Sequence, residues 1–345
     1  MAVANNAPST IPKNLLRINV KTPHKIPKII FPLFVIGELQ GREATKKDER
    51  IKVYTNEINL KLPASLNKAI SLCNGKYIAR MDADDICLPD RFEKQFKFME
   101  KNPDVALSSC RFLTVKNGVY ASGGAGGRCD CEALKAMLLV TNPILHPGVI
   151  AKAAVMKKLK YDTSLTCTED LELWTRMVME AQKIQILPEY LLIYRLHDKQ
   201  ITSTTLERQH TEVLKIQQTY YATLLREMDE EMKAFYIGGI YFREHVDVEK
   251  FLAYAKWLKN VTTRNFEKTA INYALLEILA EYKRCGVSKA DVVKAMLTFN
   301  PCFLIKEMLR RKKAAQKDIE KCMKVATDIG LKHTLGTKEF PIFEK

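Results

Sequence analysis

The feature that most constrains the fold is the segment 77–85, YIARMDADD, in which a short apolar run ends in three carboxylates. Residues 64–72 before it have the apolar spacing of a helix, and Gly75 follows where a helix commonly stops. A helix, a glycine stop, a buried strand and then acids is the order of an α/β unit whose strand presents ligands at its carboxyl end. We therefore expect a buried strand over 77–81 with the acids at its end.

Crowded carboxylates repel one another unless a cation lies between them. Ligand sets made only of oxygen suit Mg²⁺ or Mn²⁺, which proteins usually hold through one or two carboxylates and the phosphates of a substrate. The alternative is a solvated acidic turn followed by a helix that begins near Asp90. Because a buried strand leads directly into the acids, we predict a metal and nucleotide site.

Three ordered blocks resemble one known family. Residues 75–95, GKYIARMDADDICLPDRFEKQ, are similar to the central motif of family 2 glycosyltransferases, which are inverting enzymes with the GT-A fold. Residues 142–147, NPILHP, resemble the acceptor-side loop of that family, and 168–176, TEDLELWTR, resemble its ED motif. YRLH at 194–197 follows as in bacterial members. The resemblance runs from about Asp48 to about Thr202 and implies a mixed sheet flanked by helices.

The resemblance also implies roles for the acidic residues. Asp84 matches the direct metal ligand of the family, and Asp82 matches the residue that contacts the ribose of the donor or the metal. His197 matches a late histidine that can reach the metal or the diphosphate, although a histidine in a surface loop is the plainer interpretation. The expected cofactor is Mn²⁺ or Mg²⁺.

The ED block supplies the predicted catalytic base, Asp170. It lies at the start of a predicted helix, where the helix dipole and free N–H groups favour an ionised carboxylate. The alternative is that Glu169 and Asp170 merely occupy the first turn of a helix that Thr168 caps. Trp174 is predicted to belong to the core rather than to a platform for the sugar.

Two further residues are predicted to contact the donor. His146 lies between two prolines in the second block and could position the acceptor or the diphosphate, whereas a turn histidine with satisfied hydrogen bonds is the alternative. Asn67 resembles the helix position that borders the nucleotide, and an ordinary polar helix residue explains it equally well.

The resemblance departs from the family at the front of the chain. Family members open with a strand of the form VSVIIPxYN and then present an aspartate-rich DDGS turn, and neither is found here. Residues 1–26 are polar and are predicted to be irregular, while 28–37 resemble a degenerate version of one missing strand. We therefore expect an atypical or truncated nucleotide-binding segment over 1–45.

Other patterns predict the rest of the architecture. Residues 91–101 read as a helix, 105–112 and 115–120 as paired strands around a turn at 116–118, and 122–128 as a loop. Residues 184–193 form the last predicted strand, interrupted at Pro188. After about residue 205 the apolar periods become long and helical.

The fold class predicted is α/β, a GT-A-like mixed sheet followed by an all-helical C-terminal region. The predicted domains are 1–205 for the glycosyltransferase and 206–345 for the helices. Asp247 and Ser288 are predicted to cap two helices of that region.

The formal net charge of +15 calls for an anionic partner. No zinc finger, RNP-like motif or helix-turn-helix signature is present, so no nucleic-acid partner is expected. A nucleotide-sugar donor carries a diphosphate, and a glycan or lipid-linked acceptor beside anionic lipid would also attract a basic protein.

Residues 305–324 hold eight basic and three acidic side chains beside an apolar stripe that starts at Phe303. Such a helix could lie on an anionic membrane, or its stripe could pack on neighbouring helices.

The cellular location is predicted from features that the sequence lacks. The nine cysteines have no metal-ligand spacing, the first residues do not resemble a signal peptide, and no apolar run is long enough to span a bilayer. A cytoplasmic protein is expected, with a peripheral position at the inner face of the cell membrane as the open alternative.

The predicted function is transfer of a sugar, with inversion, from a nucleotide-sugar donor such as a UDP-sugar to a polysaccharide or glycolipid acceptor of the cell envelope. The alternative is a catalytically inactive relative that acts as a binding or scaffolding protein, for which the unusual front of the chain speaks. A metal-dependent nucleotidyltransferase should show a glycine-rich, basic signature near the start, and none is visible.

Overall fold

The computed structural model describes residues 2–3, 33–36, 51–54, 56–82, 85–116, 119–124, 131–196, 206–226, 228–242, 247–262 and 287–298, together with single positions between 272 and 282 and beyond 298. The predicted basic membrane helix at 303–324 lies outside this range except for three separate residues.

One sheet is parallel and contains the acid strand. Its order is β3 (Ile51–Val53), β2 (Leu33–Ile36), β1 (Ala2–Val3) and β5 (Met81–Asp82). Each neighbouring pair is parallel, and Val3 lies beside Asp82. The prediction that residues 1–26 are irregular was wrong at β1, because a strand of two residues is too short for a periodic pattern to reveal it.

The second sheet is mixed. Its order is β4 (Tyr77–Ala79), β9 (Ile150–Lys152), β7 (Val105–Lys116), β10 (Lys183–Leu196) and β6 (Ile86–Cys87), with β8 (Val119–Gly124) paired to β7. The long strands β7 and β10 are parallel, whereas β4, β6 and β8 each run antiparallel to their neighbour.

The predicted strand over 77–81 is shared between the two sheets. Its first half, β4, pairs with β9, and its second half, β5, pairs with β1. Arg80 lies between the halves, and its N–H donates to the carbonyl of Val149 at 3.0 Å. The acids therefore follow the point at which the chain passes from one sheet to the other.

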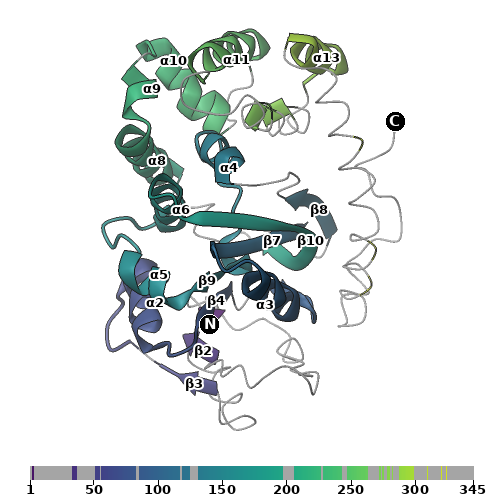
Figure 1. Cartoon of the computed structure of the whole chain (residues 1–345). Helices are drawn as coiled ribbons and strands as arrows, with labels where there is room; N and C mark the ends of the chain where they lie inside the picture. Colours follow the sequence, from purple (N-terminus) through teal and green to yellow (C-terminus); the bar gives the residue numbers. More distant parts are fainter. Residues whose placement is uncertain are drawn as a thin grey trace.

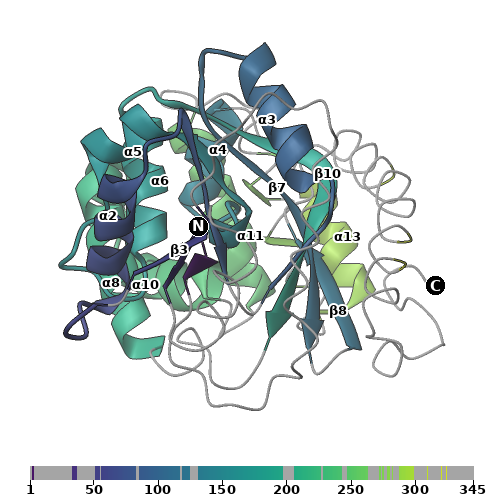
Figure 2. The same cartoon turned by 90° about the horizontal axis from the view of Figure 1, so that it is seen from below.

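Helices cover the mixed sheet on both sides (Figure 2). One group holds α2 (Lys61–Leu72), α5 (Ala153–Leu159) and α6 (Glu169–Met179), and α3 (Arg91–Lys101) lies across the sheet from it. The helix predicted from residue 64 begins earlier, at Lys61, because Pro63 is tolerated in a first turn where its missing N–H has no intrahelical partner. These helices and strands confirm the α/β class.

The structure differs from the predictions at the loop 122–128 and at Pro188. β7 and β8 pair antiparallel on either side of residues 117 and 118, which lie outside the described residues, and β8 continues to Gly124 and so includes the start of the predicted loop 122–128. Pro188 does not end the last strand, because the register of β10 against β7 shifts between Leu187 and Tyr190. Proline fits a strand at such a bulge, where no ladder hydrogen bond is required from it.

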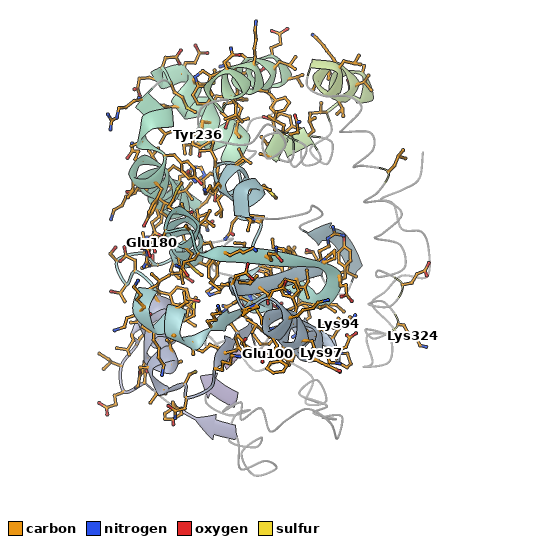
Figure 3. The ribbon with its side chains drawn as sticks, viewed as in Figure 1. Lys94, Lys97, Glu100, Glu180, Tyr236 and Lys324 are labelled. Atoms are coloured by element: carbon orange, nitrogen blue, oxygen red, sulfur yellow. The ribbon has the colours of Figure 1, made fainter. Side chains whose placement is uncertain are left out.

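A helical region follows, as predicted (Figure 1). It contains α8 (Leu206–Tyr220), α9 (Ala222–Arg226), α10 (Glu230–Phe235), a π-helix over Tyr236–Tyr241, α11 (Val248–Thr262) and α13 (Lys289–Thr298). Its core packs against α4 (Cys131–Leu138), and Tyr236 lies in its interior (Figure 3). Asp247 and Ser288 cap α11 and α13 as predicted, accepting from the N–H groups of Lys250 and Asp291. Among the described helices, none is both long and apolar enough to cross a bilayer.

Candidate active site

The acid strand ends beside a buried arginine. Arg80 is 6% exposed, and its Nη2 lies 2.7 Å from Oδ1 of Asp82, whose side chain is 22% exposed. A second arginine fixes this backbone, because Arg91 of α3 donates to the carbonyls of Arg80 at 2.6 Å and of Pro147 at 2.7 Å. The Asp82 carboxylate, which is predicted to bind the donor, is thus partly accessible to solvent and is held by Arg80.

Asp85 has a structural function in this arrangement. Its carboxylate is buried, and Oδ1 accepts the N–H of Arg195 on β10 at 3.0 Å. The bond joins the acidic turn to the end of β10, directly before the predicted histidine at 197. Asp84 and His197 themselves lie outside the described residues, and so their predicted roles stay predictions.

The predicted metal site at the end of the acid strand would hold a divalent cation through carboxylate oxygens. In the described part of the chain, no three His, Cys, Asp or Glu side chains are grouped so that they could hold a metal ion. Asp82 supplies a partly exposed oxygen ligand at a strand end, and the sequence places Asp84 two residues further on. Two carboxylates with remaining positions for phosphate and water match the way proteins hold Mg²⁺ or Mn²⁺. Of these two carboxylates, Asp82 lies within the described residues and Asp84 lies outside them, so the metal site stays a prediction.

The second sequence block forms a turn that faces the ED helix. The Asn142 side-chain oxygen accepts the N–H of Ile144 at 3.2 Å, and its Nδ2 donates to Oδ2 of Asp170 at 3.0 Å. Because its oxygen is already used, the amide can present only its donor side to the carboxylate. Asn142 therefore orients Asp170.

Asp170 lies in the first turn of α6 and is partly buried. Besides Asn142, the N–H of Leu171 donates to it, at 2.7 Å to Oδ1. Burial raises the pKa of the Asp170 carboxyl, and these two donors together with the charge of Arg80 oppose the rise. A carboxylate with a raised pKa that is still held by donors suits a general base near neutral pH.

Glu169 is more deeply buried than Asp170. Burial, followed by repulsion from Asp170, raises the pKa of the Glu169 carboxyl to about 7. Its Oε1 lies 3.8 Å from Nδ1 of His146. Burial therefore raises the pKa of both carboxyls of the ED pair.

His146 begins a short 3₁₀ turn, His146–Gly148, and is buried. Its Nε2 lies 2.7 Å from the hydroxyl of Tyr161, and its ring packs edge-on against Trp174 with centroids 5.6 Å apart. Burial and the charge of Arg80 hold the pKa of His146 well below its usual range, so that the ring is neutral. Trp174 is fully buried, in agreement with its predicted place in the core.

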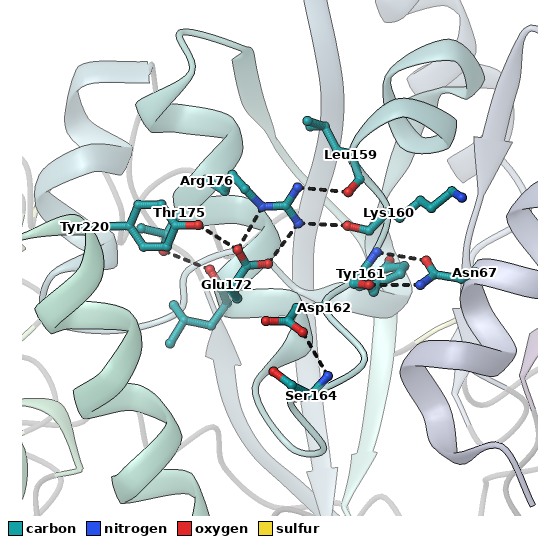
Figure 4. A network of polar contacts seen from close by, with 11 residues as sticks. Asn67, Leu159, Lys160, Tyr161, Asp162, Ser164, Glu172, Thr175, Arg176 and Tyr220 are labelled. Atoms are coloured by element: carbon teal, nitrogen blue, oxygen red, sulfur yellow. Dashed lines mark hydrogen bonds and ion pairs between the residues drawn. The ribbon is translucent and has the colours of Figure 1, made fainter.

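Asn67 lies on α2 and serves the backbone in this structure. Its Nδ2 donates to the carbonyl of Tyr161 at 2.9 Å, and its Oδ1 accepts the N–H of the same residue at 2.8 Å (Figure 4). This pair of bonds fixes the segment that carries the Tyr161 ring against His146. The predicted contact of Asn67 with the nucleotide stays a prediction.

Comparison with known proteins relates part of the chain to one family. The family model described as "Glycosyl transferase family 2" matches residues 39–149, which include the acid strand and the turn at His146. A relative from Methanocaldococcus jannaschii, "Uncharacterized glycosyltransferase MJ1057", is 38% identical over 159 residues, 46% of this chain and 55% of the relative. The "O-antigen biosynthesis glycosyltransferase WbnJ" of Escherichia coli is 32% identical over 48% of this chain and 65% of its own length.

These matches support a family 2 glycosyltransferase, with the family model covering residues 39–149. The chain spans about half to two thirds of the length of these relatives. Among solved structures, the "Mannosyltransferase PcManGT from Pyrobaculum calidifontis in complex with GDP-Man and Mn2+" matches with a TM-score of 0.49 and 13% identity, over 90% of this chain and 85% of that chain. The similarity to the family therefore rests on the sequence matches.

Two residues of this family 2 site were not among the residues predicted from sequence. Asn142 opens the second block, and its position before a proline is a local signal for an Asx turn that could have been noticed. Arg80 stands between apolar residues within a strand that was predicted to be buried, and a buried arginine needs anionic partners nearby. Neither sequence pattern predicts the side chain that Asn142 or Arg80 contacts, and only the tertiary structure shows these contacts.

Proposed function

We propose that this protein transfers a sugar from a nucleotide-sugar donor, with a UDP-sugar as the first candidate, to a polysaccharide or glycolipid acceptor with inversion. The observation that carries the proposal is the convergence of three separated blocks on one site. Arg80 of the first block is bonded to Asp82, Asn142 of the second block donates to Asp170 of the third, and the charge of Arg80 acts on both Asp82 and Asp170. Family membership and the O-antigen relative support a glycan product.

In the proposed reaction, Asp170 accepts the proton of an acceptor hydroxyl. The hydroxyl oxygen then forms a bond to the anomeric carbon of the donor as the bond from that carbon to the diphosphate oxygen breaks. The nucleoside diphosphate leaves with the bonding electrons. Because no enzyme nucleophile intervenes, a single displacement inverts the configuration at that carbon, by analogy with single-displacement glycosidases.

Asn142 and the Leu171 N–H hold the two oxygens of Asp170 in place before the proton moves. Each oxygen keeps a further lone pair, which is available to the acceptor hydroxyl. Glu169 is a buried neighbour of Asp170, and two ionised carboxylates at this distance repel each other. This repulsion favours the uptake of a proton by either Glu169 or Asp170.

Asp82 and Asp84, with His197, would hold a divalent cation, Mn²⁺ or Mg²⁺. When bound, such a cation neutralises the negative charge that develops on the leaving diphosphate. His146 and Asn67 are proposed to shape the donor side of the pocket, through the turn and the Tyr161 segment that they fix.

The proposed division of the chain is 1–205 for the transferase part and 206–345 for the helical part. We further propose that the protein works in the cytoplasm, with peripheral contact at the inner face of the cell membrane through residues 303–324, where a lipid-linked acceptor would be available. The charge of +15 supports this location because anionic lipid attracts clustered lysine and arginine.

Calorimetric titration with UDP and GDP, with and without Mn²⁺, tests the proposal. We expect binding that depends on the metal and that Asp84→Ala weakens about tenfold or more, roughly 1.4 kcal/mol. The matched control is Asp104→Ala, an exposed acid paired with Lys183, which should bind like the unchanged protein. Equal binding by Asp84→Ala without metal would refute the site, and binding without any transfer would favour the inactive relative.

A further inference from the structure

The loop that leads into the ED helix is held by a carboxylate from the helical region. Glu212 lies on α8 and is buried. Its Oε1 accepts the N–H of Thr166 at 3.0 Å and the hydroxyl of the same residue at 3.1 Å. Its Oε2 accepts the N–H of Cys167 at 3.1 Å and the hydroxyl of Thr168 at 2.8 Å. Four donors from three consecutive residues thus converge on one side chain.

The helix start is held from outside rather than by a local cap. Thr168 precedes α6, and the sequence suggested that its hydroxyl could cap that helix. The structure shows no such bond, and the hydroxyl is instead given to Glu212. The shape of the chain directly before Glu169 and Asp170 is therefore set by a residue more than 40 positions away.

A second bond from α8 fixes α6 one turn further along. The hydroxyl of Tyr220 donates to Oε1 of Glu172 at 2.7 Å (Figure 4). Glu172 also accepts from Arg176, at 2.8 Å from Nε and 2.9 Å from Nη2, and Arg176 in turn donates to the carbonyls of Leu159 and Lys160. This network holds α6 at Glu172 and Arg176, and Glu212 holds the chain directly before the start of the helix.

We propose that Glu212 is a positioning residue for sugar transfer: by binding 166–168 it holds Asp170 at the acceptor hydroxyl. The inference rests on the proposed role of Asp170 as the base. It makes α8 part of the catalytic unit even though α8 lies beyond the proposed boundary at residue 205. A displacement of about 1 Å of a catalytic group can cost about 100-fold in rate, so that a brace of this kind has measurable consequences.

The chemistry requires a carboxylate at this position. All four groups that face Glu212 are donors, and a carboxylate is purely an acceptor. A glutamine has the same shape but would turn an NH₂ group toward two of these donors. The loop would then have to move away to relieve the mismatch.

The test is Glu212→Gln in the full chain, with kcat, KM and UDP affinity measured. We expect kcat to fall about 10- to 100-fold, while KM for the donor and the UDP affinity change less than about threefold. The matched control is Glu207→Gln, an exposed glutamate earlier on α8, which should behave like the unchanged protein. Unchanged kcat in a folded Glu212→Gln protein would overturn the proposal.

A double mutant separates positioning from general damage. If Glu212 acts through Asp170, Glu212→Gln should change the residual rate of Asp170→Asn less than about threefold, because the base that it positions is already absent. An equal loss in both backgrounds would overturn the proposal. Full transfer by Asp170→Asn alone would instead refute the proposed base, and so the two failures are distinguishable.

If Glu212→Gln does not fold, Thr168→Val removes only one of the four donors and keeps the shape of the side chain. We expect a several-fold loss of kcat with donor affinity unchanged. No loss in this variant would overturn the proposal.

Discussion

The two predicted carboxylate sites of this protein are built in opposite ways. Asp82 stands at a strand end with a fifth of its side chain exposed and an arginine at 2.7 Å. Glu169 and Asp170 start a helix, and Glu169 is almost fully buried, with its Oε1 3.8 Å from Nδ1 of the neutral His146 ring. At the first site, Arg80 compensates the charge of Asp82. At the second site, burial disfavours the charged forms of Glu169 and Asp170.

This difference assigns different chemistry to the same type of side chain. A partly exposed carboxylate that is paired with a cation, such as Asp82, can still bind a ligand through its free side. Burial favours the protonated form, and it raises the pKa of both members of the ED pair. A group with a pKa moved toward neutrality is the better acceptor of a proton. The contrast therefore separates donor binding from proton transfer.

The largest expected effect comes from exchanging the acids for amides one site at a time. Asp170→Asn should lower transfer by about 10²- to 10⁴-fold, because an amide cannot accept the proton, and should leave UDP affinity nearly unchanged. Asp82→Asn should chiefly weaken UDP binding. Steady-state kinetics and calorimetry on both variants measure the split. Survival of transfer within about tenfold in Asp170→Asn would place the base elsewhere.

An intermediate effect is expected for Arg80→Met, which removes the buried cation shared by the two sites. Within the described chain, Nε and Nη1 of Arg80 have no hydrogen-bond partner, so that its main interactions are the bond to Asp82 and its charge. Loss of a buried partner should cost roughly 3 kcal/mol in the free energy of unfolding, as measured by urea denaturation. Lys76→Met, at an exposed lysine, is the control.

Arg80→Met should also alter catalysis. The charge of Arg80 lowers the pKa of Glu169 and of Asp170, and so its removal should move the acidic limb of the kcat/KM profile to higher pH. An unmoved profile would show that the two sites are electrostatically independent.

The smallest effect concerns Glu169 and stability. Because the pKa of this carboxyl is about 7 in the folded protein and about 4.5 in the unfolded chain, the folded state keeps a proton that the unfolded chain releases. The contribution of Glu169 to stability is therefore greatest below about pH 4.5 and declines as the pH rises toward 7. Glu169→Gln should remove most of that decline, on the order of 1–3 kcal/mol.

Denaturant unfolding at several pH values measures this effect. The control is Glu180→Gln, an exposed residue just beyond the end of α6, whose pH dependence should match that of the unchanged protein (Figure 3). The same slope in Glu169→Gln and the unchanged protein would show that Glu169 is ionised in the folded state.

Local patterns were sufficient for much of the fold. The strand over 77–81, the helix over 91–101 and the start of the helix at Glu169 were predicted where the structure has them, because each depends on apolar spacing and stop signals within one segment. The two-residue strand β1 was missed because its pairing partners, not its own residues, define it.

The candidate site likewise combines features that the sequence predicted with features that depend on tertiary contacts. The sequence by itself determined the family, the α/β class and the blocks that carry Asp82, His146 and Asp170, since motif order and periodicity are properties of the chain. Only the tertiary structure decided that Arg80 compensates Asp82 and that Asn142 orients Asp170. It also decided that Glu212 accepts a hydrogen bond from the hydroxyl of Thr168. The physical reason is that burial and hydrogen-bond partners are set by segments that meet in space, and neither is encoded in the spacing of residues along one segment.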